Sequence, residues 1–234
     1  MYELAHLRSV LRIAACATVV CLTGCASETL FRSNFDQTAI GQPPAPMQDV
    51  GTAAVFGPAG RVIVIAAPVA PSGKWVQVSR PVGPDVVGMQ GKLSKFPGDG
   101  TYTFAATMFM PAGAGIATIQ FEPSINGPND LGAFLHLDFM PDNTVRIDDI
   151  DATKFGSFQR NEPFIVQVTL KIGAPASTAH VVLAGATASG TKDYTILTPL
   201  QPQSRQFGAI RIWQGFPNNG AFDATNISVT RQLQ

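Results

Sequence analysis

The chain has 234 residues, and its 16 Lys and Arg balance 16 Asp and Glu. Because these charges are few and scattered, they argue against nucleic acid as a partner, which requires a basic face or stripe. The 22 glycines, 18 prolines and 15 phenylalanines, without long helix-forming stretches, are typical of an all-β protein.

The first residues have the layout of a secretory signal. Arg8 and Arg12 precede an uncharged stretch at residues 13–22, and small residues follow it. A membrane-spanning helix needs roughly twenty apolar residues, so this stretch is too short for a retained anchor. We therefore expect residues 1–24 to be a signal peptide that is removed.

Leu22-Thr23-Gly24-Cys25 resembles the lipobox of bacterial lipoproteins. In that family the cysteine sulfur receives a diacylglycerol, the chain is cut before it, and the new amino terminus is usually acylated, for example with palmitate. The resemblance implies a lipid on Cys25, and Ala26 after it implies sorting to the outer membrane, with the side of the membrane left open. Each buried methylene contributes about 0.8 kcal/mol, so two or three acyl chains would anchor the protein almost permanently. The alternative is a plain secretory signal with Cys25 as a free thiol.

The remaining cysteines, Cys16 and Cys21, lie in the expected signal peptide, so no disulfide framework is possible in the mature protein. Residues 25–50 are polar and Pro-rich, and "GQPPAP" at 41–46 predicts an extended backbone. We expect a tether there that could hold the body away from the lipid. Residues 30–36 alternate apolar and polar side chains and could form a first strand within it.

Residues 51–234 are expected to form one β-sandwich domain. Short alternating or β-branched segments, separated by turn residues such as "FPGDG" and "MPDN", predict strands at 61–67, 74–79, 101–110, 115–122, 132–140, 143–148, 163–172, 179–185, 207–215 and 225–231. With no helical pattern between them, they favour an antiparallel sandwich or barrel.

Alternation assigns one apolar and one polar face to these strands. The predicted core sets are Tyr102, Phe104, Ala106, Met108 and Met110, and Phe164, Val166, Val168, Leu170 and Ile172. This pattern favours two sheets packed through their inner faces.

The order of "YTFAATMFMPAGAGIATIQFEP", "FLHLDFMPDNTVRI" and "FGAIRIWQGFPNNGAFDATNISVTR" resembles the concanavalin A-like lectin/glucanase jelly roll over most of the mature chain. The resemblance implies an antiparallel two-sheet sandwich with a concave sheet on which sugars bind. A lipocalin-like barrel is the competing fold.

Glycan hydrolases of that superfamily carry closely spaced carboxylates on one strand, because hydrolysis needs a proton donor and a nucleophile or base. After Cys25 this chain has only Glu28, Glu122 and Glu162, and none is paired in that way. We therefore assign no catalytic residue and no cofactor, and expect binding without hydrolysis.

Two pairs of residues carry the ligand-binding hypothesis. His136 and Asp138 share one strand face and suit acid–base chemistry or a metal, although a solvated polar pair is the simpler interpretation. Arg211 and Trp213 share the face opposite Ile210 and Ile212 and could form a glycan platform, unless Trp213 packs into the core.

The predicted ligand site comprises Gln120, His136, Asp138, Gln167, Arg211 and Trp213 on one concave sheet. The acidic turn with Asp148, Asp149 and Asp151 could bind calcium or be simply solvated, and no metal site is assigned. The expected function is an outer-membrane lipoprotein that binds carbohydrate or another envelope component. The alternatives are a glycan-acting enzyme with an atypical site and an envelope scaffold whose protein partners are not identified.

Overall fold

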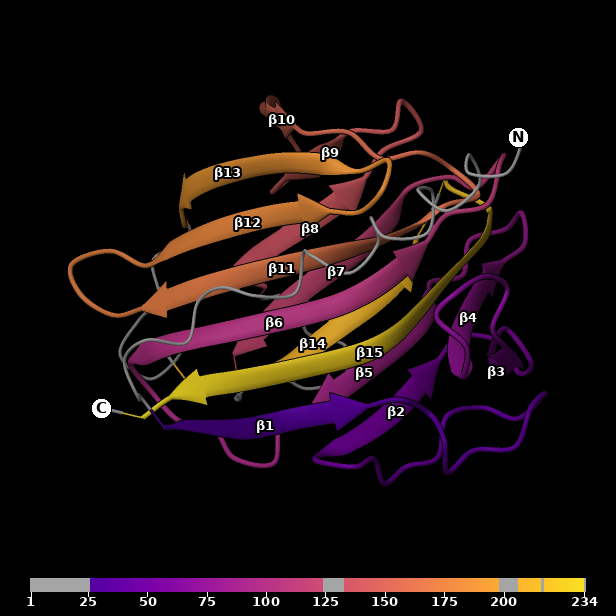
Figure 1. The fold of residues 1–234 in the computed structure, drawn as a ribbon, viewed down its shortest axis with the longest axis horizontal. Helices are drawn as coiled ribbons and strands as arrows, with labels where there is room; N and C mark the ends of the chain where they lie inside the picture. The colour runs from indigo at the N-terminus through magenta and orange to yellow at the C-terminus, as the bar shows by residue number, and fades with distance from the viewer. Residues whose placement is uncertain (1–25, 124–132, 198–205, 216, 234) are drawn as a thin grey trace, which may run out of the picture.

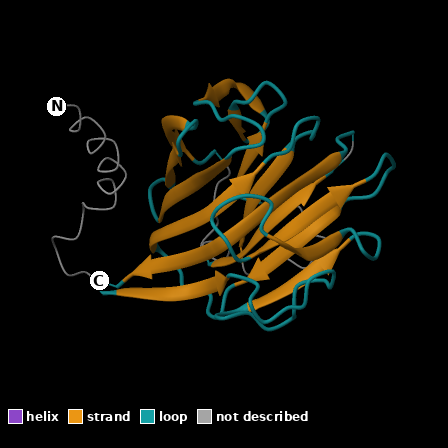
Figure 2. Ribbon diagram, turned by 45° about the vertical axis from the view of Figure 1, so that its right-hand side comes forward, coloured by secondary structure: helices purple, strands orange, loops and turns teal. Residues whose placement is uncertain are grey.

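The computed structural model describes residues 26–123, 133–197, 206–215 and 217–233. Within these ranges the chain forms strands and turns but no helix, and hence no helix with the length and apolar character to cross a bilayer (Figure 2). The predicted all-β class, an antiparallel two-sheet sandwich, is confirmed. The separate sheets exclude the lipocalin-like barrel.

The front sheet in Figure 1 contains eight strands among the described residues. Their order is β13 (Ser189–Thr195), β12 (Thr178–Ala184), β11 (Pro163–Ile172), β6 (Gly100–Phe109), β15 (Gly220–Gln232), β4 (Lys74–Arg80) and β3 (Val62–Ala66), and β1 (Ser27–Ser33) also pairs with β15. The long strand β15 pairs with β6 along one side. On its other side it pairs first with β4 and then with β1.

The back sheet contains seven strands in the described part of the chain. Their order is β10 (Ile150–Phe155), β9 (Val145–Ile147), β8 (Leu135–Phe139), β7 (Ala117–Pro123), β14 (Phe207–Gln214), β5 (Val87–Lys92) and β2 (Thr52–Phe56). The sequence pattern had located ten of the fifteen strands and suggested β1. It gave no sign of β2, β5, β10 or β13.

The core lies between the two sheets, where alternate residues of each strand meet. The predicted inward sets of β6 and β11 are all buried. Aromatic rings join the layers: Phe104 meets Phe121 edge to face at 5.3 Å between ring centroids, and Tyr102 meets Phe207 at 5.5 Å. This packing holds each inner face dry and leaves polar residues to the outer faces.

The described part of the predicted tether is packed on the sandwich. Leu30 and Phe31 of β1 are buried, as is Phe35 after it. The Pro-rich stretch pairs with β3, since Gly41 N donates to Val64 O at 2.8 Å and Val64 N donates to Gln42 O at 2.7 Å. The first-strand alternative therefore describes this segment better than a free tether.

Candidate functional site

The outer face of the back sheet brings five of the six predicted ligand residues onto one surface. Cross-strand pairing places Asp138 opposite Thr118 and Thr118 opposite Trp213, with Arg146 on the far side of Asp138. The next row joins His136, Gln120 and Arg211. These residues share a face because their neighbours Leu137, Ile119 and Ile212 all point into the core.

A cavity of about 260 Å³ opens on this surface over β7, β8, β9 and the end of β14. Its polar lining comes from Thr118, His136, Asp138, Arg146, Asp149 and Asn218, and its aromatic lining from Trp213. Three of the predicted ligand residues, His136, Asp138 and Trp213, therefore converge on it. Thr118, Arg146 and Asn218 had not been predicted.

Arg146 organises the charges of the cavity. Its Nη2 donates to Asp138 Oδ2 at 2.9 Å and to Asp149 Oδ1 at 2.6 Å, while Thr118 Oγ1 donates to Asp138 Oδ1 at 2.7 Å. His136 Nε2 lies 3.1 Å from Asp149 Oδ2. Burial raises the pKa of Asp138, and its hydrogen bonds to Thr118 and Arg146 oppose that rise.

Two glycines leave room for Trp213. A Cβ on Gly88, its partner across β5, would lie 2.5 Å from Trp213 Cβ, and a Cβ on Gly215 would meet the indole ring. The indole is partly exposed to solvent, and its buried Nε1 has no hydrogen-bond partner among the described residues. Trp213 therefore lines the cavity instead of packing into the core.

The turn after β14 closes the cavity at Asn218. The buried Arg80 guanidinium donates to the carbonyl oxygens of Asn218 and Gly83, and Arg80 Nε donates to Asp85 O at 2.6 Å. Gly115 N donates to Asn219 O at 2.8 Å. These bonds fix the turn that carries one wall of the cavity.

Arg211 and Gln120 are occupied elsewhere, and they do not line the cavity. Arg211 Nε lies 2.8 Å from Glu122 Oε1, and Gln120 Nε2 donates to the same oxygen at 3.2 Å. Gln90 Nε2 donates to Glu122 Oε2 at 2.7 Å, and the Arg211 guanidinium lies over the Phe56 ring at 5.6 Å. Glu122 is therefore the centre of a buried polar network on the back sheet.

Placing Gln167 with the other five residues was wrong. Gln167 lies on β11 in the front sheet, between Ala105 and Val182, with an exposed side chain. The alternating sequence of β11 resembles that of the back-sheet strands. Alternation therefore predicted correctly that Gln167 faces outward, but it could not show to which sheet β11 belongs.

His136, Asp138 and Asp149 bring three possible metal-ligating atoms within 4.8 Å of one another. Arg146 already occupies both carboxylates, so a cation would have to displace a guanidinium. Asp148 accepts from His136 N at 2.8 Å instead of joining this group. The three carboxylates of the acidic turn thus do not form one calcium-binding set.

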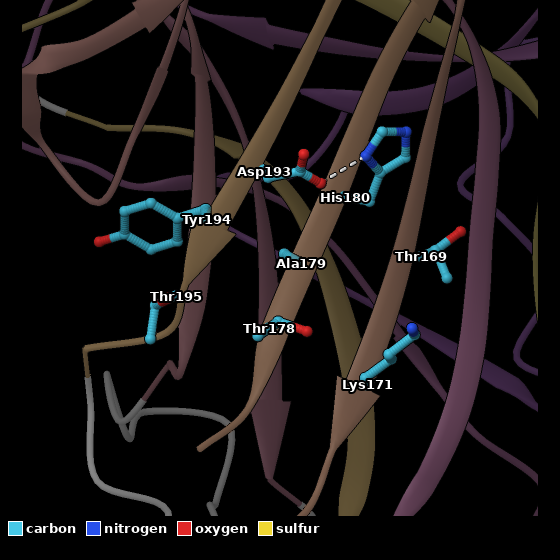
Figure 3. Close-up of a pocket in the computed structure, with 8 residues that line it drawn as sticks. All are labelled: Thr169, Lys171, Thr178, Ala179, His180, Asp193, Tyr194 and Thr195. Atoms are coloured by element: carbon cyan, nitrogen blue, oxygen red, sulfur yellow. Dashed lines mark hydrogen bonds and ion pairs between the residues drawn. The ribbon is translucent and has the colours of Figure 1, made fainter.

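A second hollow, of about 360 Å³, lies on the front sheet over β11, β12 and β13 (Figure 3). His180 Nδ1 and Asp193 Oδ1 approach to 2.7 Å there, on largely exposed side chains. Tyr194 also lines this hollow, but in Figure 3 its ring points away from the His180–Asp193 pair. The back-sheet cavity is the stronger candidate because it combines an aromatic ring with buried charges.

Comparison with solved structures places this fold among lectins. Lectin I from Ulex europaeus, solved with the methyl glycoside of α-L-fucose, has a TM-score of 0.50 and 11% identity, with 88% of this chain and 98% of the lectin covered. Arcelin-5, a lectin-like defense protein from Phaseolus vulgaris, has a TM-score of 0.48 and 10% identity, over 89% of this chain and 99% of arcelin. The fold is thus similar to the jelly-roll sandwich of lectin I, and at such identity the likeness shows the fold alone. No protein-family model matches this chain, nor does any curated protein sequence.

Proposed function

We propose that this protein is a non-catalytic glycan-binding lipoprotein of a bacterial outer membrane, with the back-sheet cavity as its binding site. The observation that carries the proposal is the placement of Trp213 in one cavity with Asp138, Arg146 and Asp149. The likeness of the fold to a lectin is consistent with it.

The lining suits the chemistry of a sugar. A sugar ring presents an apolar C–H face, which stacks on an indole, and a rim of hydroxyl groups that both donate and accept. Carboxylate oxygens of Asp138 and Asp149 would accept from hydroxyls, and Arg146 would donate to oxygens. A volume of about 260 Å³ favours a ligand of one or two rings.

The charge arrangement favours binding over hydrolysis. Arg146 lies between Asp138 and Asp149 and donates to both, so neither carboxylate is poised as an independent acid or nucleophile. The network of Glu122 with Arg211, Gln120 and Gln90 lies outside the cavity.

Binding is tested with purified protein on a panel of envelope and dietary polysaccharides by affinity electrophoresis and calorimetry. Trp213→Ala should weaken binding at least about tenfold, because the stacking surface is lost. Gln167→Ala is the matched control on the front sheet and should leave the affinity unchanged. A Trp213→Ala protein that folds and binds as tightly as the wild type contradicts the proposal.

A glycan-acting enzyme is the second candidate, favoured by one observation. The Asp138 and Asp149 ligand atoms lie no more than 4.8 Å apart, whereas the carboxyl groups of retaining glycosidases lie roughly 5 Å apart, and burial raises the pKa of Asp138. If the wild-type protein releases reducing ends from a glycan and Asp138→Asn does not, the enzyme proposal replaces the binding proposal.

Lipid attachment to Cys25 is the other half of the proposal, supported by Leu22-Thr23-Gly24-Cys25 and by the absence of any cysteine after Cys25. Mass spectrometry of the protein extracted from membranes should find an acylated amino-terminal cysteine. A free thiol, or a protein recovered in the soluble fraction, would overturn the anchor without affecting glycan binding.

A further inference from the structure

The sheet begins directly after the residue expected to carry the lipid. Ser27 of β1 pairs with Gln232 of β15, and Leu233 N donates to Ala26 O at 2.8 Å. The hydrogen-bonded structure therefore reaches to within one residue of Cys25 in the sequence. A lipid on Cys25 would thus be separated from β1 by Ala26 alone in the sequence.

Several other segments meet at the end of the sandwich where β1 begins and β15 ends, near Ser27 and Gln232. We call it the β1 end. The β5–β6 connection lies there, since Ser94 N donates to Leu30 O at 2.8 Å and Lys95 forms an ion pair with Glu28. β6 begins opposite the last residue of β11, and β13 ends opposite the first residue of β12. In Figure 1 the arrowheads of β11, β13 and β15 all point to this side of the molecule.

The β1 end exposes apolar side chains among lysines. Phe96, Leu197 and Leu233 are 38%, 62% and 40% exposed. Lys92 Nζ lies 5.5 Å from the centre of the Phe96 ring, and Lys95 and Lys171 have exposed side chains nearby. Apolar groups flanked by lysines are the composition found where a protein surface enters the headgroup region of a bilayer.

The candidate cavity lies at the opposite end. Its wall at Asn218 is part of the turn that joins β14 to β15, so the 13 residues of β15 separate it from the β1 end. At about 3.3 Å per residue, this separation is on the order of 40 Å.

We propose that the β1 end rests against the lipid bilayer, with Phe96, Leu197 and Leu233 in the headgroup region, and that the back-sheet cavity lies at the end of the sandwich farther from the membrane. This orientation rests on the proposed acylation of Cys25. It goes beyond anchoring, because it fixes which surface faces lipid and which end is available to a glycan.

The orientation is tested with fluorescent labels on the full lipoprotein. Residues 26–234 contain no cysteine, so Phe96→Cys, Leu233→Cys and Val82→Cys each introduce one reactive thiol. Val82 is the matched control, since it is 84% exposed in the β4–β5 connection, where Arg80 pairs with the first residue of β15. The labelled proteins are reconstituted into vesicles with and without brominated phosphatidylcholine.

Brominated lipid should quench the labels at Phe96→Cys and Leu233→Cys at least about twofold and leave Val82→Cys unquenched. Equal quenching at both ends, or quenching at Val82→Cys alone, on protein whose acylation is verified by mass spectrometry, overturns the orientation and leaves the anchor intact. Protein without acylation overturns the anchor and this inference together. Neither result affects the glycan-binding test, which compares the affinities of the wild-type and Trp213→Ala proteins.

Discussion

Three buried carboxylates on the outer sheet faces have different partners. Glu122 meets the cationic Arg211, and Asp138 meets Arg146 and Thr118. Asp223 on β15 accepts a hydrogen bond from the neutral Gln77 Nε2 at 3.1 Å. Burial therefore dominates at Asp223 and raises its pKa to about 6.

This pKa predicts that Asp223→Asn stabilises the protein at neutral and alkaline pH. Because the folded-state pKa lies above the usual value of 3.8, stability contributed by the protonated form is present below that value and lost as pH rises through about 6. Asn stays neutral and keeps an acceptor for Gln77, so the free energy of unfolding at pH 8 should rise by up to about 3 kcal/mol. Urea titrations at pH 4 and pH 8 measure the difference, and a loss of stability at pH 8 would show that the charged form is favoured in the fold.

The strand β5 shapes the site through two glycines. A Cβ on Gly88 would meet Trp213 Cβ and Phe56 Cζ at 2.5 and 2.7 Å, and one on Gly91 would meet the Phe31 ring at 2.7 Å. The missing side chains let Trp213 approach on the outer face and Phe31 on the inner face. Close approach of neighbours is a recognised role of glycine within a strand.

Gly88→Ala is expected to lower the free energy of unfolding by about 2 kcal/mol, since the added methyl also meets the backbone oxygen of Ile212 at 2.6 Å. Gly98→Ala is the control, because a Cβ there would meet nothing within 4 Å. Thermal denaturation compares the two, and the intrinsic fluorescence should shift in Gly88→Ala as Trp213 moves. Equal melting temperatures would refute the steric argument.

The strands that the sequence pattern missed have a common physical reason. β2, β10 and β13 are edge strands, where one side of the backbone and much of the side-chain surface face solvent, so apolar alternation is weak. β5 is internal, but Gly88 and Gly91 interrupt its apolar pattern. Strands buried on one face, such as β6 and β11, were predicted with nearly correct ends.

Part of the site followed from the sequence in the same way. Alternation placed His136 with Asp138 and Arg211 with Trp213, but the order β8-β7-β14 that joins them depends on long-range pairing. Arg146 could have been found from the alternation of Val145 and Ile147, which are buried on either side of it. That Arg211 turns to Glu122 depends on side-chain contacts that no local pattern encodes.

At the scale of the whole molecule, β1 links the two sheets. It pairs with β15 in the front sheet, while its Phe31 ring reaches Gly91 of the back sheet. The segment from Ala26 to Ser33 is therefore part of the folding unit.

Phe31→Ala should accordingly lower the free energy of unfolding by about 3–5 kcal/mol, the usual range for a buried Phe. Ile40→Ala, at a residue that is 59% exposed, should change it by less than about 0.5 kcal/mol. Chemical denaturation followed by circular dichroism distinguishes them. If both substitutions are equally mild, the segment behaves as the tether that the composition suggested.

Because Ser27 pairs with Gln232, the first and last strands lie hydrogen-bonded side by side, and the two ends of the described sandwich are close together. A linker of a few residues would join them and allow new ends to be cut in an exposed turn such as 81–86, which is the geometry that permits circular permutation. Under the proposed acylation of Cys25, a reporter fused after β15 would lie at the membrane-facing end of the sandwich, whereas one inserted at 81–86 would lie at the opposite end, where Arg80 pairs with Gly220.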